Sequence, residues 1–108
     1  MATVSGFGKV KHPGRQRIEH ALERGLYGWS RVPMLAEQWS SWDNDTRLAI
    51  EVDWPIEDDL LLQLQGWADS GMLDATQQRR YRELAAIADC NRPVIERLFD
   101  QIKSETTP

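Results

Sequence analysis

The stretch that most constrains the fold is residues 81–102, YRELAAIADCNRPVIERLFDQI, close to the end of the 108-residue chain. Apolar residues recur at helical spacing on both sides of a polar interruption that contains Asn91 and Pro93. Proline is tolerated in the first turn of a helix but not in its interior, and asparagine is a favourable N-cap. The stretch therefore predicts two short amphipathic helices separated by a tight break.

Two further helices are predicted upstream. Ile18, Leu22 and Leu26 recur every four residues, and Gly25 is placed to end that helix in a left-handed cap. Pro33 suits the first turn of the next helix. One face of that second helix carries Leu35, Trp39 and Trp42.

The middle of the chain gives one clear helix and one ambiguous segment. A helical face of Ile56, Leu60, Leu64 and Trp67 follows Pro55, and Asp74 with Gln77 forms a capping-box pattern before the next helix. Residues 46–54 instead alternate apolar and polar side chains, the period of a half-buried strand. A lone strand leaves backbone groups unpaired, so this segment would have to pair with the N-terminal arm or with a second copy.

The overall expectation is a mainly α protein. We predict a small bundle of about five helices, a short β segment near 47–54 with helix as the alternative there, and a C-terminal helix-turn-helix-like pair. Residues 1–13 contain Gly6, Gly8 and Pro13 without a hydrophobic period, which predicts a flexible basic arm. Residues 14–108 are then a single helical domain, which is large enough to bury a hydrophobic core without disulfide bonds or a metal ion.

Charge is distributed unevenly along the chain. Residues 1–31 carry six Lys/Arg and two acids, residues 32–74 carry one Arg and ten acids, and residues 75–108 carry six bases and five acids. The three segments therefore hold +4, −9 and +1, which matches the net charge of −4. A general nucleic-acid binder is usually basic overall, although this pattern leaves room for a local basic face.

Other features bear on location and chemistry. The single cysteine excludes an internal disulfide framework, no apolar run is long enough to cross a bilayer, and the first residues lack the apolar segment of a signal peptide. We therefore expect a cytoplasmic protein with no membrane partner.

The segment Leu84–Leu98 resembles the helix-turn-helix motif of bacterial and phage DNA-binding regulators. Leu84, Ala85 and Ala88 match the apolar and small positions of the first helix, and Cys90 matches the apolar residue of the turn. The run from Asn91 to Ile95 is similar to the S-R-P-T-V opening of many recognition helices, and Ile95 and Leu98 match its buried positions. Asp89 stands where the motif usually has glycine.

What the resemblance implies is a small regulator of the phage- or plasmid-repressor or antitoxin type that binds double-stranded DNA. Its second helix would enter the major groove, with Arg92 and Arg97 reaching bases or phosphates and Asn91 reaching a phosphate. Upstream arginines would grip the backbone: Arg79, Arg80 and Arg82. The arm would add Lys9, Lys11, Arg15 and Arg17. Glu96 and Asp100 on the same face oppose this interpretation, because acids repel phosphate.

The alternative is a protein-binding adaptor or inhibitor that acts through its acidic, Trp-rich middle. Tryptophan is favoured at interaction hot spots, although a buried core role explains most of the five. The residues expected at such a surface are Trp39, Trp42, Asp43, Asp45, Asp58 and Asp59. For the DNA-binding regulator, the middle segment would instead serve homodimerisation or bind a partner protein.

No pattern indicates an enzyme. Cys90 has no histidine near it, His20 lacks a second set of ligands, and there is no phosphate-binding loop or nucleophile elbow. We expect no catalytic residues, no metal and no cofactor.

Overall fold

The computed structural model of the protein describes the backbone of residues 11–106 and the side chains of residues 11–103. This part of the chain is mainly α, as predicted, and contains no strand. In order, the helices are α2 (Arg15–Ser30), α3 (Val32–Gln38), the 3-10 helix η1 (Trp39–Ser41), α4 (Asn44–Asp53), α5 (Pro55–Asp69) and α6 (Ala75–Thr106). Over the same residues no helix combines the length and apolarity needed to span a membrane.

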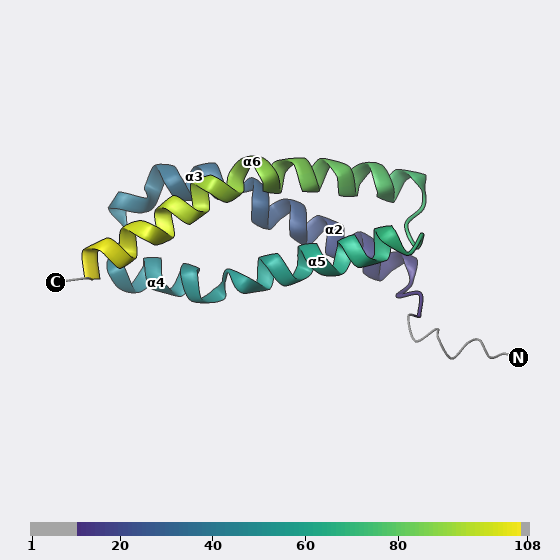
Figure 1. The fold of residues 1–108 in the computed structure, drawn as a ribbon, viewed down its shortest axis with the longest axis horizontal. Coiled ribbons are helices and arrows are strands. Elements are labelled where there is room, and N and C mark those ends of the chain that lie inside the picture. Colours follow the sequence, from purple (N-terminus) through teal and green to yellow (C-terminus); the bar gives the residue numbers. More distant parts are fainter. Residues whose placement is uncertain (1–10, 107–108) are drawn as a thin grey trace, which may run out of the picture.

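These elements form three helical rods rather than the expected bundle of about five helices (Figure 1). The first rod is α2 with α3, the second is α4 with α5, and the third is α6. Arg31 and Trp54, the residues at the two joints, keep backbone angles of the right-handed helical region, so each joint bends its rod without reversing it. The second rod runs antiparallel to the other two.

The core lies along the axis shared by the three rods. On α6 the residues that face this axis follow steps of four and three along the whole helix: Gln77, Tyr81, Leu84, Ala88, Asn91, Ile95, Leu98 and Ile102. The second rod has the same spacing at Ile50, Trp54, Glu57, Leu61, Leu64 and Ala68. Such spacing keeps one face of each helix against its neighbours over many turns, as in coiled coils.

Two glycines of α2 allow the rods to approach closely. A Cβ atom on Gly25 would lie 2.8 Å from Cδ2 of the buried Leu84, and a Cβ atom on Gly28 would collide with the carboxylate of Glu57. The expectation that Gly25 ends the helix is therefore wrong, since α2 continues to Ser30. Both glycines serve packing in a helix interior, where glycine otherwise costs stability.

The predicted β segment near 47–54 is wrong, because these residues belong to α4 and the joint after it. Asp43 begins the helix as its N-cap: its Oδ1 accepts a hydrogen bond from the backbone N–H of Thr46 at 2.9 Å. Ile50 and Trp54, four residues apart, face the core, whereas Val52 is 72% exposed. The alternating pattern of residues 46–54 therefore also contains the four-residue spacing of a helix, at Ile50 and Trp54.

The predicted break within residues 81–102 is also wrong, since α6 is one helix of 32 residues with Pro93 inside it. Proline removes one backbone hydrogen bond and bends a helix, and α6 changes direction near its middle in Figure 1. Leu84, Ala88, Ile95 and Leu98 lie on both sides of the bend and are all buried. A continuous apolar face therefore outweighs the local cost of the proline.

Local capping was predicted correctly before α6. The backbone N–H of Gln77 donates to Oδ1 of Asp74 at 2.8 Å, and the N–H of Asp74 donates to Oε1 of Gln77 at 3.0 Å. Of the expected arm, residues 1–10 lie outside the described residues. His12 donates from Nε2 to the carbonyl oxygen of Met72 at 3.1 Å and accepts from the N–H of Gly14 at 2.9 Å.

Candidate functional site

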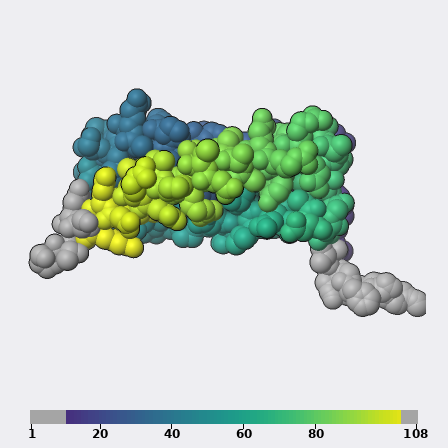
Figure 2. Space-filling view, turned by 45° about the horizontal axis from the view of Figure 1, so that its top comes forward, coloured from purple at the N-terminus to yellow at the C-terminus, as the bar shows by residue number. Residues whose placement is uncertain are grey.

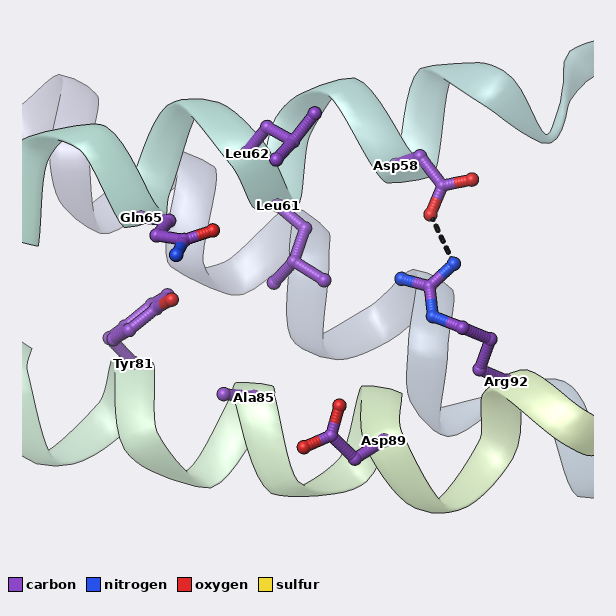
Figure 3. A pocket seen from close by; sticks show the side chains of 8 residues that line it. All are labelled: Asp58, Leu61, Leu62, Gln65, Tyr81, Ala85, Asp89 and Arg92. Carbon is purple, nitrogen blue, oxygen red and sulfur yellow. Dashed lines mark hydrogen bonds and ion pairs between the residues drawn. The ribbon is translucent and has the colours of Figure 1, made fainter.

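A groove of about 520 Å³ separates α5 from α6, and we call it the α5–α6 groove (Figure 3). Its lining comes from α5 at Asp58, Leu61, Leu62 and Gln65, and from α6 at Tyr81, Ala85, Asp89 and Arg92. Leu62 is 63% exposed, while Leu61 and Tyr81 are half-buried. The groove thus has an apolar floor that a further helix or side chain could cover.

Arg92 spans the groove at one end. Its guanidinium donates to Oδ1 of Asp58 at 2.9 Å (Figure 3). Its Cζ atom also lies over the ring of Trp29, 4.9 Å from the ring centroid. Both partners of the ion pair are about two-fifths exposed, so solvent screens it and its contribution to stability is small. Its main effect is geometric, because it holds the Arg92 side chain against the body of the protein.

The rest of the groove is electronegative. Burial raises the pKa of Tyr81, and the carboxylates of Asp69 and Asp89 raise it further by opposing a phenolate. The Tyr81 phenol therefore stays neutral, and neither Asp69 nor Asp89 has an arginine or lysine ion-pair partner in the described part of the chain.

The groove continues toward the other end of the molecule. A second hollow of about 210 Å³ shares Asp58 and Arg92 with the first and is otherwise lined by Glu51, Trp54, Pro55, Ile95, Glu96 and Phe99. Together the two hollows contain four carboxylates and one arginine, which is a formal charge of −3. The site is an apolar channel with an acidic rim.

The channel lies between the second rod and α6. In Figure 2, α6 crosses the visible face from green to yellow, and the second rod runs in teal along its lower edge. The exposed side of α6 itself alternates in charge, with Glu83, Asp89 and Glu96 interspersed among its arginines. It forms no uniform basic surface.

The residues expected to read DNA have other roles or lie apart. Asn91, predicted as an N-cap, instead donates from Nδ2 to the carbonyl oxygen of Trp29 at 2.8 Å and so satisfies the end of α2. Arg79 and Arg97 are exposed, but they are eighteen residues apart on one helix, which is about 27 Å at 1.5 Å per residue. Arg82 is also exposed and Arg80 is half-buried. The geometry that the helix-turn-helix resemblance requires is not formed.

The residues expected at a protein-binding surface are also dispersed. Trp39 is buried in the core, and Trp42 packs against it edge-on and is half-buried. Asp43 caps α4, and the hydrogen bonds from Thr46 lower its pKa below the ordinary value of 3.8. Asp45 and Asp59 are exposed. Of the set, only Asp58 lines the α5–α6 groove.

The apolar residues of the groove were missed by the sequence analysis. Leu61, Leu62, Tyr81 and Ala85 are not expected at a binding site from the sequence, because only one apolar face of each helix is apparent in its spacing. A second helical face was available as a signal: Asp58, Leu62, Gln65 and Asp69 are spaced by four, three and four residues beside the core face of α5.

The described residues 11–103 contain no group of three or more His, Cys, Asp or Glu side chains placed to hold a metal ion. Comparison with known proteins returned no match, whether with protein-family models, with curated proteins or with solved structures.

Proposed function

We propose that the protein is a non-enzymatic, protein-binding adaptor or inhibitor, and that its α5–α6 groove binds a basic amphipathic helix of the partner. The observation that carries this proposal is the combination of apolar lining residues, Leu61, Tyr81 and the exposed Leu62, with a rim of formal charge −3. An apolar stripe on the partner would cover Leu61, Leu62 and Tyr81. Lysines or arginines beside that stripe would pair with Asp89 and with the acids farther along the rim.

A helix is the partner that fits a channel between two helices. The open faces of α5 and α6 repeat with steps of three and four residues, so a third helix can lie along them with its own three-and-four spacing. The acidic middle of the sequence contributes Glu51 and Asp58 to this rim. The tryptophans of that middle act mainly as core, with Trp54 as part of the channel floor.

DNA binding is the weaker proposal. It requires a recognition helix that stands clear of the protein body with Asn91 and Arg92 facing outward. Here Arg92 is held between Asp58 and Trp29, and Asn91 is hydrogen-bonded to α2. Non-specific affinity for duplex DNA depends on the number of phosphates that cations can reach, and Glu96 and Asp100 lie beside Arg97.

The test is a binding titration by fluorescence anisotropy. The probes are a labelled peptide of about three heptads with leucine at the core positions and lysine elsewhere, the same composition in scrambled order, and a labelled random DNA duplex. We expect the amphipathic basic peptide to bind, and the scrambled peptide and the duplex to bind at least about tenfold more weakly, a difference of about 1.4 kcal/mol.

Matched variants locate the site. Asp89→Lys and Leu62→Asp should each weaken binding of the basic peptide about tenfold. Asp59→Lys and Val52→Asp, which change an exposed acid and an exposed apolar residue outside the groove lining, should leave it unchanged. Equal effects in both pairs, or tighter binding of the duplex than of the peptide, would reject the proposal.

A further inference from the structure

A second groove lies on the opposite side of α5, between α5 and α2, and its charge is opposite to that of the first. We call it the α2–α5 groove. It has a volume of about 230 Å³ and is lined by Arg17, His20 and Arg24 of α2 and by Ile56, Leu60 and Trp67 of α5. No carboxylate lines it.

The two arginines of this groove have no ion-pair partner among the residues that line it. Arg17 lies over the ring of Trp67, with 5.6 Å to the centroid, and pairs with no carboxylate among the described residues. Arg24 makes no ion pair within residues 11–103, although its charge partly offsets the rise that burial causes in the pKa of Glu57 on α5. Arg15, two residues before Arg17, is by contrast paired with Glu19 at 3.2 Å. Two arginines without an ion-pair partner in the described residues therefore line the groove.

The floor of the groove is apolar and open. Ile56 is 55% exposed, although the sequence placed it on the core face of its helix, and Leu60 beside it is half-buried. An exposed isoleucine between arginines is the composition of a surface that a partner covers, with cations left to pair at the rim. Gln63, the remaining polar residue from α5, carries no charge to oppose an acidic partner.

The spacing of the groove residues defines the shape of the occupant. Arg17, His20 and Arg24 are separated by three and four residues on α2. On the second rod Ile56, Leu60, Gln63 and Trp67 are separated by four, three and four residues. These are the steps by which two helices receive a further helix in a bundle.

We infer that the α2–α5 groove is a second docking site, which takes an acidic amphipathic helix from a partner protein. Leucine-like side chains of that helix cover Ile56 and Leu60, and its Asp or Glu residues pair with Arg17 and Arg24. With the acidic α5–α6 groove on the other side of α5, the protein can hold two helices of opposite charge. This inference goes beyond the proposed function and does not depend on it.

The experiment uses the full chain, isotopically labelled for NMR, and an acidic peptide of about three heptads with leucine at core positions and glutamate elsewhere. A scrambled peptide of the same composition is the control. We expect binding of the amphipathic peptide, with the largest amide shift changes at residues 17–24 and 56–67. The scrambled peptide should bind at least about tenfold more weakly.

Variants separate the two grooves. Arg24→Glu and Ile56→Asp should each reduce affinity for the acidic peptide about tenfold and leave the basic peptide unaffected. Leu62→Asp should do the reverse, and Arg82→Glu, an exposed change outside both grooves, should affect neither. Each variant is used only after its amide spectrum shows that the fold is retained.

Three results would overturn the inference: no binding of the acidic peptide, equal binding of the scrambled peptide, or shift changes confined to other surfaces. Sedimentation of the free protein adds a fourth. Self-association that Ile56→Asp abolishes would assign the groove to a second copy of the chain instead of an acidic helix.

Discussion

Three glycines within helices of this protein differ in the space around them: two face atoms of a neighbouring helix, and one faces open space. Gly25 faces the fully buried Leu84, and Gly28 faces the carboxylate of Glu57, so both positions set how closely α2 can approach its neighbours. Gly66 in α5 has open space where a Cβ would lie. Sequence alone cannot separate these cases, because what matters is the atom on the other helix.

The first prediction compares two glycine substitutions. Gly25→Ala should lower the free energy of unfolding by about 1–2 kcal/mol. Overpacking against Leu84 destabilises the variant by about 1–3 kcal/mol, and the higher helix propensity of alanine stabilises it by up to about 1 kcal/mol. Gly66→Ala should raise it by about 0.5–1 kcal/mol, because only the propensity changes. Urea denaturation measures both, and a stabilising Gly25→Ala would disprove the close approach of α2 and α6.

Glu57 gives a prediction for pH. Its side chain is 12% exposed, and burial raises its pKa above the ordinary value of 4.5, opposed by Arg31 and Arg24 and reinforced by Asp58. The folded state therefore binds this proton more tightly than the unfolded state. The resulting stabilisation is complete below about pH 4.5 and is lost as pH rises through the raised pKa.

Glu57→Gln removes that titration. The stability of the variant relative to the natural protein should therefore increase from about pH 4 to about pH 7. Urea denaturation at both pH values measures the difference, which does not depend on how well glutamine itself packs. A difference that stays constant, or that falls with pH, would contradict a raised pKa.

At the scale of elements, local signals were predictable and long-range ones were not. The Asp74–Gln77 capping box depends on neighbouring residues and formed as expected. Residues 46–54 satisfied two periods at once, since Ile50 and Trp54 fit both a strand and a helix. Packing in the core favours the helix over the strand, because Trp54 contacts Trp29 of α2, with ring centroids 5.2 Å apart.

The same reasoning explains the error in α6. Asn91 and Pro93 together indicate the start of a helix, and no local signal opposes them. The steps of four and three from Gln77 to Ile102 do oppose them, but the polar Asn91 occupies one of those steps and interrupted the apolar pattern. Its hydrogen bond to the end of α2 shows why a polar residue is accommodated there.

Pro93→Ala tests whether α6 is continuous. In a helix interior proline costs about 3 kcal/mol relative to alanine, although it restricts the unfolded chain by about 0.4–1 kcal/mol. Pro93 is exposed, so no core contact is lost. We expect a net stabilisation of about 1–2 kcal/mol in urea denaturation, because contacts that fit the bent helix weaken when α6 straightens and offset part of the gain. Destabilisation would instead indicate a proline in the first turn of a separate helix.

At the scale of the whole molecule, the uneven charge of the sequence becomes a division between two sides of α5. The acidic middle contributes to a rim of charge −3 beside α6, and cations of the N-terminal segment line the groove beside α2. The sequence indicated this polarity and a mainly α fold. It could not indicate the grooves, since each is formed by residues from two rods whose pairing is set by the three-dimensional packing.

The α5–α6 groove and the contacts of Asn91 and Arg92 with the body of the protein require α6 to be one helix built into the bundle. Backbone chemical shifts and sequential contacts of residues 86–96, measured by NMR on the full chain, test this most directly. We expect helical Cα shifts at every residue from Ala86 to Glu96, with medium-range contacts that continue from Ala88 across Cys90 to Val94. A left-handed residue at Asp89 or Cys90, followed by the N-cap pattern of a new helix at Asn91, would contradict it.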